Sequence, residues 1–413
     1  MTDPTYLARN VPGWSVKDWE KGIDVERMRR YRMERVQEQV RQRGLAGIIL
    51  FGGVNVRYAT GTRWAQIYNL HSPFRCAWVP AQGKVTMFDW ERAHGGDGMP
   101  DIIDAVHDAI VFTYFPAGDR AGEFADRWAG EMAALIRRDG GARPRVAIDI
   151  CEPIAMLALM AQGIEIVSGE EVIEQACAIK TRDEITLILQ TITIAEAGLA
   201  RVRENLRPGI TENELWAELH HENIRNGGEW VEYRLAGSGG RTNPWGQECS
   251  DRMIRAGEFF AIDTGMIGPW GYGADMSRTF HCKPGKPTEE QRRLYRTAWE
   301  NIQHNLPLIR AGLTFRELSE RAYRLPDEFW EQRYAMPFHG MGMGDEWPSI
   351  PYFRDWERAG YDGVLEAGMV ITVESYIGAV GGTDGVKLEE MVLVTEEGHQ
   401  LLTTFPFEDE LLA

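Results

Sequence analysis

The sequence predicts an α+β protein of two domains, and three observations lead to this fold class. Its 413 residues, 44% of them hydrophobic, are enough for two cores. Helix-like and strand-like segments alternate over residues 25–175, as in an α/β domain. In residues 176–413, long helices lead into short apolar runs that end in acidic residues. Residues 1–24, rich in Pro, Gly and Trp, are expected to form an irregular arm.

The first domain is expected to begin with a charged helix that Gly44 closes as a C-cap. Short apolar segments then predict strands, and a helix with an apolar face precedes the last of them. The helices are expected at residues 25–44 and 124–141, and the strands at residues 46–53, 76–81, 84–90 and 145–150.

The second domain is expected to follow a long helix over residues 170–206, where apolar residues recur at three- and four-residue steps. The next helix begins at Thr211, because Glu214 three residues later completes a capping box. Strands are then expected at residues 229–238, 258–267, 274–283, 369–375 and 386–398, and helices at residues 288–312 and 315–333.

Composition limits the partners and the compartment. A net charge of −17 argues against binding to a nucleic-acid backbone or to an anionic membrane. The five cysteines are scattered and form no CxxC pair, which argues for a reducing compartment without a disulfide framework. Neither a signal-peptide core nor a run of 18 apolar residues is present in the sequence, so a cytoplasmic location without a membrane span is expected.

Five side chains in the second domain have the chemistry of metal ligands. They are Asp263, Asp275, His339, Glu374 and Glu389. Several of these acids end or precede apolar, strand-like runs, where a buried carboxylate is costly unless a cation compensates it. Four carboxylates and one imidazole suit divalent Mn, Fe, Co or Zn. The pattern therefore predicts a metal centre rather than five unrelated surface acids.

The order Asp, Asp, His, Glu, Glu resembles the pita-bread superfamily, which includes methionine aminopeptidase, aminopeptidase P, prolidase and creatinase. The most specific matching segments are DTG…GYGADMSRTF and the HG-x-G that starts at His339. The resemblance implies a C-terminal pita-bread domain, an N-terminal creatinase-like α/β domain and a homodimer. It also implies that the five residues bind two divalent metal ions, with Glu389 bridging them.

Two departures from the peptidases of this superfamily concern their substrate-handling histidines. The segment GSGGRTNPWGQE contains no histidine, although the peptidases carry one there. In HGMGMGDEWP, Asp345 and Glu346 stand where the peptidases carry a second histidine. These departures argue against ordinary peptide hydrolysis. Arg241, in the first of these segments, either binds a carboxylate or forms a salt bridge within its loop.

The segments 220–249, 339–348 and 386–390 resemble one branch more closely, the dimethylsulfoniopropionate (DMSP) lyases called DddP. Those lyases carry DTD at the first metal aspartate, whereas this chain has Asp263-Thr264-Gly265. The resemblance implies a metal-dependent lyase that cleaves DMSP, or a close zwitterionic analogue, to dimethyl sulfide and acrylate.

Elimination from DMSP needs a base, and the resemblance assigns this role to Asp345. Without the resemblance, the sequence around Asp345 is equally compatible with a structural role, as an acidic residue in a turn. Tyr334 is a weaker candidate for positioning or proton transfer. Aromatic faces hold sulfonium cations by cation–π contact. The residues expected to line the substrate pocket are Trp245, Trp347 and, from a segment that resembles one shaping the site across the dimer, Trp64, Tyr68 and His71.

Two other functions are compatible with the superfamily. One is a metallohydrolase that cleaves an Xaa-Pro-like peptide or a small-molecule C–N bond. The other is a binding protein that has lost catalysis. The intact set of five ligand-type residues argues against lost catalysis, and the missing histidines argue against peptide hydrolysis.

Overall fold

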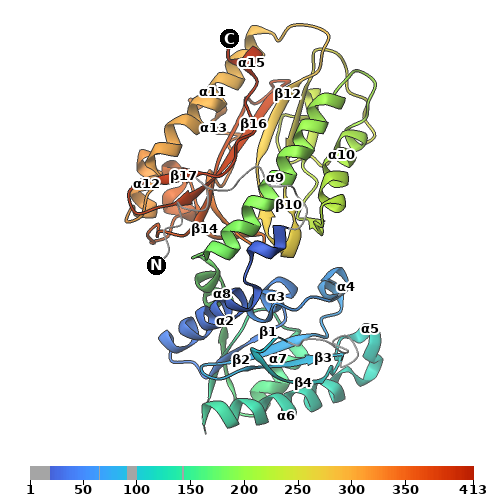
Figure 1. Cartoon of the computed structure of the whole chain (residues 1–413), viewed down its shortest axis with the longest axis vertical. Helices are drawn as coiled ribbons and strands as arrows, with labels where there is room; N and C mark the ends of the chain where they lie inside the picture. Colours follow the sequence, from blue (N-terminus) through green and yellow to red (C-terminus); the bar gives the residue numbers. More distant parts are fainter. Residues whose placement is uncertain (1–18, 65, 91–99, 142–143) are drawn as a thin grey trace. The chain divides into compact units, whose positions relative to one another are not determined.

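The computed structural model describes residues 19–64, 66–90, 100–141 and 144–413, which form two compact units (Figure 1). The N-terminal unit comprises residues 24–177, and the C-terminal unit comprises residues 178–413 together with residues 19–23. Of the predicted arm, residues 1–18 lie outside the described residues, and a short 3-10 helix η1 spans Trp19–Gly22.

A six-stranded sheet in the order β4-β3-β2-β1-β5-β6 forms the centre of the N-terminal unit. β1 is buried along its whole length and pairs antiparallel with β2 and parallel with β5. The strands are β1 (Gly47–Leu50), β2 (Cys76–Pro80), β3 (Val85–Asp89), β4 (Ile103–Asp108), β5 (Arg145–Ile148) and β6 (Glu165–Ser168). The mixed sheet with its helices is the predicted α/β domain.

The helices of this unit bury one face each. α6 (Ala121–Gly140) buries residues at three- and four-residue steps, among them Trp128 and Met132, which pack with Phe51 and Trp78 in one core. The predicted helix before the last strand is therefore confirmed. The remaining helices are α2 (Val25–Gln42), α3 (Gly53–Thr60), α4 (Gln66–His71), α5 (Tyr114–Ala117), α7 (Pro153–Ala161) and α8 (Glu170–Cys177).

Antiparallel strands form the C-terminal unit around one five-stranded sheet, in the order β14-β13-β15-β16-β17. Its strands are β13 (Phe338–Met341), β14 (Asp345–Ile350), β15 (Val370–Gly378), β16 (Gly385–Val394) and β17 (His399–Leu401). Two three-stranded sheets, β12-β9-β8 and β11-β10-β7, complete the unit. Their strands are β7 (Trp230–Val231), β8 (Ala236–Ser238), β9 (Phe259–Asp263), β10 (Met266–Ile267), β11 (Gly273–Ala274) and β12 (Ser277–His281).

Long helices complete the C-terminal unit, and α9 and α10 pack side by side (Figure 1). The capping box predicted at Thr211 and Glu214 is present at the start of α10. The helices are α9 (Arg182–Asn205), α10 (Glu212–Arg225), α11 (Glu289–Asn305), α12 (Phe315–Arg321), α13 (Asp327–Trp330), α14 (Trp356–Ala359) and α15 (Asp409–Leu412).

Several predicted elements were wrong in their extent, among them the strand expected over residues 258–267, which forms β9 and β10 in two different sheets. The long helix over residues 170–206 is two helices, because Thr181 caps a new start with Glu184 in a second capping box. The helix over residues 315–333 is also two short ones, since Pro326 interrupts the helical hydrogen bonding. The strand expected over residues 229–238 is reduced to the short β7 and β8.

α9 is long and apolar enough to cross a membrane, with a mean hydropathy of 1.4 over an 18-residue window. Inside the unit, however, 61% of that window is buried. This share of burial is typical of a helix that packs in the core of its unit.

Candidate metal centre

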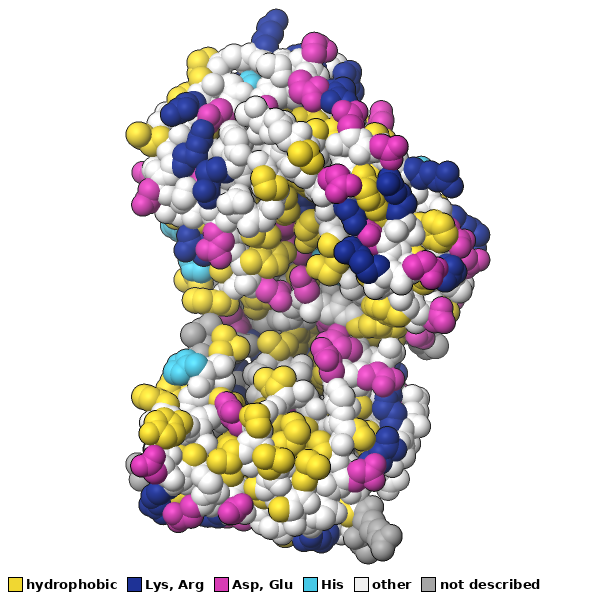
Figure 2. Space-filling model, turned by 180° about the vertical axis from the view of Figure 1, so that it is seen from behind, with side chains coloured by type: hydrophobic (Ala, Val, Ile, Leu, Met, Phe, Trp, Pro, Cys, Tyr) yellow, Lys and Arg dark blue, Asp and Glu magenta, His cyan; other side chains and the backbone are white. Residues whose placement is uncertain are grey.

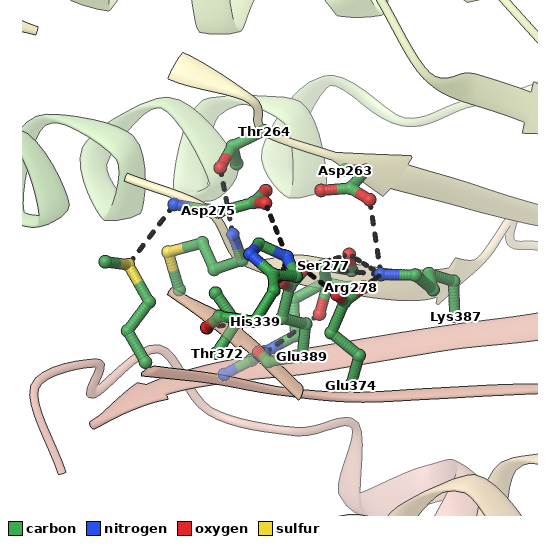
Figure 3. Close-up of polar contacts among 12 residues, drawn as sticks. Asp263, Thr264, Asp275, Ser277, Arg278, His339, Thr372, Glu374, Lys387 and Glu389 are labelled. Carbon is green, nitrogen blue, oxygen red and sulfur yellow. Dashed lines mark hydrogen bonds and ion pairs between the residues drawn. The ribbon is translucent and has the colours of Figure 1, made fainter. Parts of the chain in front are cut away.

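The five predicted ligand residues converge from two sheets of the C-terminal unit (Figure 3). Asp263 ends β9, and Asp275 lies just before β12, which pairs with β9. His339 lies in β13, Glu374 in β15 and Glu389 in β16. All five are buried, with no more than 3% of each residue exposed. Residues more than a hundred positions apart therefore meet in one polar cluster.

Strand register explains how the two glutamates meet. β15 and β16 are antiparallel, and Glu374 lies directly opposite Glu389. Side chains directly opposite each other project from the same face of a sheet. From the second sheet, Ser277 Oγ donates a hydrogen bond to Glu389 Oε2 at 2.8 Å, and Thr279 Oγ1 donates one to the Lys387 carbonyl at 2.9 Å. These bonds hold the two sheets together beside the cluster.

The distances fit ligands that share metal ions. His339 Nε2 lies 2.8 Å from Glu374 Oε1, 3.7 Å from Asp275 Oδ2 and 4.0 Å from Glu389 Oε1. Two groups of three residues have ligand atoms that all lie within 4.8 Å of one another. One group is Asp275, His339 and Glu389, and the other is Asp263, Glu374 and Glu389. Glu389 belongs to both groups.

Unpaired carboxylate oxygens show that the cluster fits a divalent cation. Among the described residues, none donates a hydrogen bond to the buried atoms Asp263 Oδ1, Asp275 Oδ1 or Glu389 Oε1. Burial, together with the charges of Glu389 and Asp263, raises the pKa of Asp275 well above its usual range. Buried carboxylates without donors are costly, so the donor set is chemically suited to an oxygen- and nitrogen-binding divalent metal.

The same negative charge changes the pKa of the His339 imidazole. Although burial lowers its pKa, the neighbouring Glu374 carboxylate outweighs that effect and raises the pKa of His339 to about 10. His339 Nδ1 also lies 2.9 Å from the Gly340 carbonyl oxygen, which fixes the orientation of the ring. The ring thus presents Nε2 to the carboxylates.

Sequence reasoning missed Lys387, which lies inside the cluster. Its ammonium nitrogen is 2.6 Å from Glu374 Oε2 and 3.2 Å from both Asp263 Oδ2 and Glu389 Oε2 (Figure 3). Burial lowers its pKa, but the charges of Asp263 and the two glutamates raise it well above the usual lysine value. One signal in the sequence could have found it. Lys387 stands two residues before Glu389, so a strand places both on one face.

Asp345, the predicted base, lies beside the cluster at the first residue of β14. Its Oδ1 is 3.8 Å from His339 Nδ1, and its side chain is 37% exposed. Burial and the nearby charge of Glu374 raise the pKa of Asp345, against the lowering effect of His339. The carboxylate is therefore close to the metal-type residues and still accessible to a small molecule.

A second carboxylate, Glu232, was also missed by sequence reasoning. Glu232 Oε2 accepts a hydrogen bond from the Asp345 backbone N–H at 3.2 Å. Desolvation and the charge of Asp345 raise the pKa of Glu232 to about 7. No local motif marks this residue, because its partner is more than a hundred positions away in the sequence.

Two of the predicted aromatic residues flank the cluster. The ammonium of Lys387 lies 4.7 Å from the ring centroid of Tyr334 and 5.9 Å from that of Trp245. Burial and the charge of Glu374 raise the pKa of Tyr334, which keeps its phenol protonated at neutral pH. Trp347 instead packs against the hydrophobic core, with its ring centroid 5.3 Å from that of Phe315.

The remaining predicted aromatic residues lie in the N-terminal unit. Trp64 packs on Phe74 and Trp90 with centroid distances of 5.1 Å and 4.7 Å, and Tyr68 lies 5.1 Å from His71. They form a local aromatic cluster in that unit, and their role in a substrate pocket stays a prediction.

Gly265 stands where the resembling lyases carry a second aspartate, and its surroundings explain the small residue. Its φ is +40°, in the left-handed region that favours glycine. A Cβ at this position would meet the Tyr233 ring at 2.5 Å. The aromatic ring therefore fills the space that another side chain would need.

Arg241 takes the structural role of its two predicted alternatives. Its Nε lies 3.2 Å from Glu212 Oε2 in an ion pair, and Glu212 also accepts hydrogen bonds from Ser238 and Ser250. This network fixes the loop that carries Trp245.

The comparisons with known proteins agree with this geometry. Residues 186–396 match metallopeptidase family M24. The dimethylsulfoniopropionate lyase DddP of Roseovarius nubinhibens is 37% identical over 394 residues, which cover 94% of this chain and 88% of that protein. The lyase of the same name from Roseobacter denitrificans is 36% identical over the same shares.

Solved structures bear on the fold alone. The Xaa-Pro dipeptidase from Bacillus anthracis superimposes with a TM-score of 0.74 at 24% identity, covering 92% of this chain and 99% of that one. The predicted two-domain pita-bread architecture is thereby confirmed.

Proposed function

This chain belongs to metallopeptidase family M24, and we propose that within this family it is a metal-dependent lyase that cleaves DMSP to dimethyl sulfide and acrylate. The observation that carries the proposal is the 37% identity to a DMSP lyase over 94% of the chain. The ligand cluster and an accessible carboxylate beside it, Asp345, supply the chemistry that such a reaction needs.

In this proposal, Asp263, Asp275, His339, Glu374 and Glu389 hold two divalent cations, of Fe, Mn, Zn or Co. The two groups of ligand atoms that share Glu389 support this number. When bound, such cations supply positive charge that stabilises the substrate carboxylate as negative charge builds up beside it.

Asp345 takes a proton from the carbon next to the substrate carboxylate. The electron pair of that C–H bond forms the C=C bond of acrylate, and the C–S bond breaks so that its electrons leave with neutral dimethyl sulfide. The proton then passes from Asp345 to water, which reaches the 37% exposed side chain. The rings of Trp245 and Tyr334 offer faces for the sulfonium, and the protonated Tyr334 phenol can position the substrate.

Several further features belong to the same proposal. The protein acts on a small zwitterion in the cytoplasm as a homodimer, without a nucleic-acid or membrane partner. Trp64, Tyr68 and His71 from one subunit complete the pocket of the other, and Trp347 supports the pocket wall. The net charge of −17 supports the absence of a nucleic-acid or anionic-membrane partner, and the scattered cysteines support a reducing compartment.

The test is direct. Purified protein loaded with Fe, Mn, Zn or Co is mixed with DMSP, and headspace gas chromatography measures dimethyl sulfide. Gly-Pro and Ala-Pro are assayed in parallel, because a hydrolase of this family is the competing function. Release of dimethyl sulfide without dipeptide cleavage supports the lyase. Dipeptide turnover without dimethyl sulfide overturns it.

A further inference from the structure

Glu232 lies on the segment that runs beside the first ligand-type aspartate. β7 pairs antiparallel with β10, and β8 pairs antiparallel with β9. Between these two pairings, the Glu232 backbone N–H donates to the Gly265 carbonyl at 2.7 Å, and the Asp263 N–H donates to the Leu235 carbonyl at 2.9 Å. The backbone of Glu232 is therefore fixed relative to Asp263.

The side chain of Glu232 reaches the bend that precedes β14. Its Oε2 accepts a hydrogen bond from the Asp345 backbone N–H at 3.2 Å. A Cβ placed on Gly344 would lie 3.1 Å from Glu232 Oε1, so the carboxylate lies directly against the backbone of this bend. Through one side chain, the segment beside Asp263 thus contacts the first residue of β14.

The backbone around Asp345 is held from two sides, whereas its carboxylate is left free. Glu232 binds its N–H, and the next residue, Glu346, forms a buried ion pair with Lys180. The Asp345 carboxylate lies 3.8 Å from His339 Nδ1, which is beyond hydrogen-bond length, and its side chain is 37% exposed. Two contacts from distant parts of the chain therefore fix the backbone of an acid that can still react.

A base needs this kind of support because its geometry decides its rate. It must lie within about 2.6–3.2 Å of the atom that carries the proton, and a misplacement of about 1 Å can cost about 10²-fold. Asp345 directly follows a bend that contains Gly342 and Gly344, and glycine leaves a backbone more freedom than other residues do. A contact at the Asp345 N–H limits that freedom where the base begins.

We propose that Glu232 is a positioning residue for the reaction: its carboxylate fixes the backbone of Asp345 and so holds the base at a set distance from the strand that carries Asp263. Glu232 acts through Asp345 and does not itself take the substrate proton. The kinetic consequence rests on the proposed function, whereas the contact between Glu232 and Asp345 does not depend on the substrate.

Three variants of the full chain test the inference: Glu232→Ala, Glu232→Gln, and Glu248→Ala as a control. Glu248 is exposed and pairs through its backbone with Leu235 of the same segment, so its replacement removes a nearby negative charge without touching Asp345. Metal content, kcat and KM for dimethyl sulfide release are measured on each metal-loaded protein. Hydrogen–deuterium exchange of residues 341–350 is followed by mass spectrometry without substrate.

Glu232→Ala is expected to lower kcat by about 10²-fold, with metal content and KM unchanged. Glu232→Gln should keep kcat within about 10-fold of the wild type, because its amide oxygen still accepts the Asp345 N–H as a weaker, neutral acceptor. Glu248→Ala should behave as the wild type. An unchanged kcat in Glu232→Ala, a loss confined to KM, or equal losses in the alanine and glutamine variants would overturn the inference.

The exchange measurement separates this inference from the proposed function. Residues 341–350 should exchange faster in Glu232→Ala than in the wild type, Glu232→Gln and Glu248→Ala, because only the alanine variant leaves the Asp345 N–H without its acceptor. Equal exchange in all four proteins would overturn the inference whether or not the wild type releases dimethyl sulfide. A wild type that releases none, with the expected exchange pattern, would overturn the proposed function and leave the contact between Glu232 and Asp345 supported.

Discussion

At the scale of single residues, the structure separates the groups proposed to hold cations from the group proposed to take a proton. The five ligand-type residues are buried, whereas Asp345 is 37% exposed and lies 3.8 Å from the ring of His339. A group that exchanges a proton with substrate and water needs that access, and a ligand does not. Substitutions at Asp345 and at His339 should therefore have different consequences.

Replacement of Asp345 by asparagine should abolish elimination and leave metal content unchanged. The amide keeps the shape of the side chain but cannot accept the proton, and losing a general base costs about 10²–10⁴-fold in rate. His339→Ala should instead lose metal and activity together. Dimethyl sulfide release and metal analysis on the same preparations distinguish the two. Substantial activity in Asp345→Asn would move the role of base to another residue, with Tyr334 next to test.

Gly265→Ala should destabilise the fold because the new Cβ meets the Tyr233 ring at 2.5 Å and φ is +40°. Strain at such a backbone position costs about 1–3 kcal/mol. Thermal unfolding measures the loss. In a Tyr233→Ala background the clash with the ring disappears, so the added cost of Gly265→Ala should fall. An equal cost in both backgrounds would contradict the steric explanation.

Glu232 gives a prediction for pH. Its pKa is raised to about 7 in the fold, from an ordinary value near 4.5. The folded state therefore holds this proton more tightly than the unfolded state, and its stabilising contribution is present below about pH 4.5 and is lost as the pH rises toward about 7. Thermal unfolding of the metal-free Glu232→Gln variant should show a weaker decline over this window than the wild type. If stability falls equally with pH in the variant and in the wild type, Glu232 is not the source of the decline.

At the scale of elements, β14 is fixed by a residue from the loop that precedes α9. Lys180 forms a buried ion pair with Glu346 in β14, and their side chains are 2% and 8% exposed. Glu346 follows Asp345 directly, so this pair helps to set the position of the proposed base. Glu232 also holds Asp345, because its carboxylate accepts a hydrogen bond from the Asp345 backbone N–H.

Lys180→Met should destabilise the C-terminal unit by about 3–5 kcal/mol, because it leaves a buried carboxylate without its partner. Combining it with Glu346→Met removes both charges, so the double variant should recover much of this loss. Denaturant unfolding of the two variants makes the comparison. A double variant as unstable as Lys180→Met would show that packing, and not the unpaired charge, causes the effect.

Elements were predictable where the signal is local. The capping box at Thr211 and the apolar face of α6 can be recognised from residues close together in the sequence. Both helices form as expected. The box at Thr181 is equally local, but the apolar periodicity continues across it and concealed the break. Lys387 was missed although it stands two residues before Glu389 in the same strand, because its other partners, Asp263 and Glu374, come from other strands. Glu232 was missed because its partner Asp345 is more than a hundred positions away in the sequence.

At the scale of the whole molecule, exposed hydrophobic side chains indicate a surface that packs against another subunit. Figure 2 shows hydrophobic side chains gathered on one face of the N-terminal unit. In and near α7, Ile150, Leu157 and Met160 are 60%, 65% and 53% exposed. Exposed hydrophobic side chains that gather on one face are typical of a subunit interface. It supports the homodimer that the resemblance implies.

Light scattering should therefore give about twice the chain mass of 46.8 kDa. Leu157→Asp with Met160→Asp places two charges on this surface, and burying them in an interface would be costly, so the double variant should shift toward the monomer. If Trp64, Tyr68 and His71 of one subunit complete the pocket of the other, the monomer should keep its metal and lose dimethyl sulfide release. A wild type that is monomeric at micromolar concentration would contradict both the dimer and the shared pocket, and the pocket would then have to be complete within one chain.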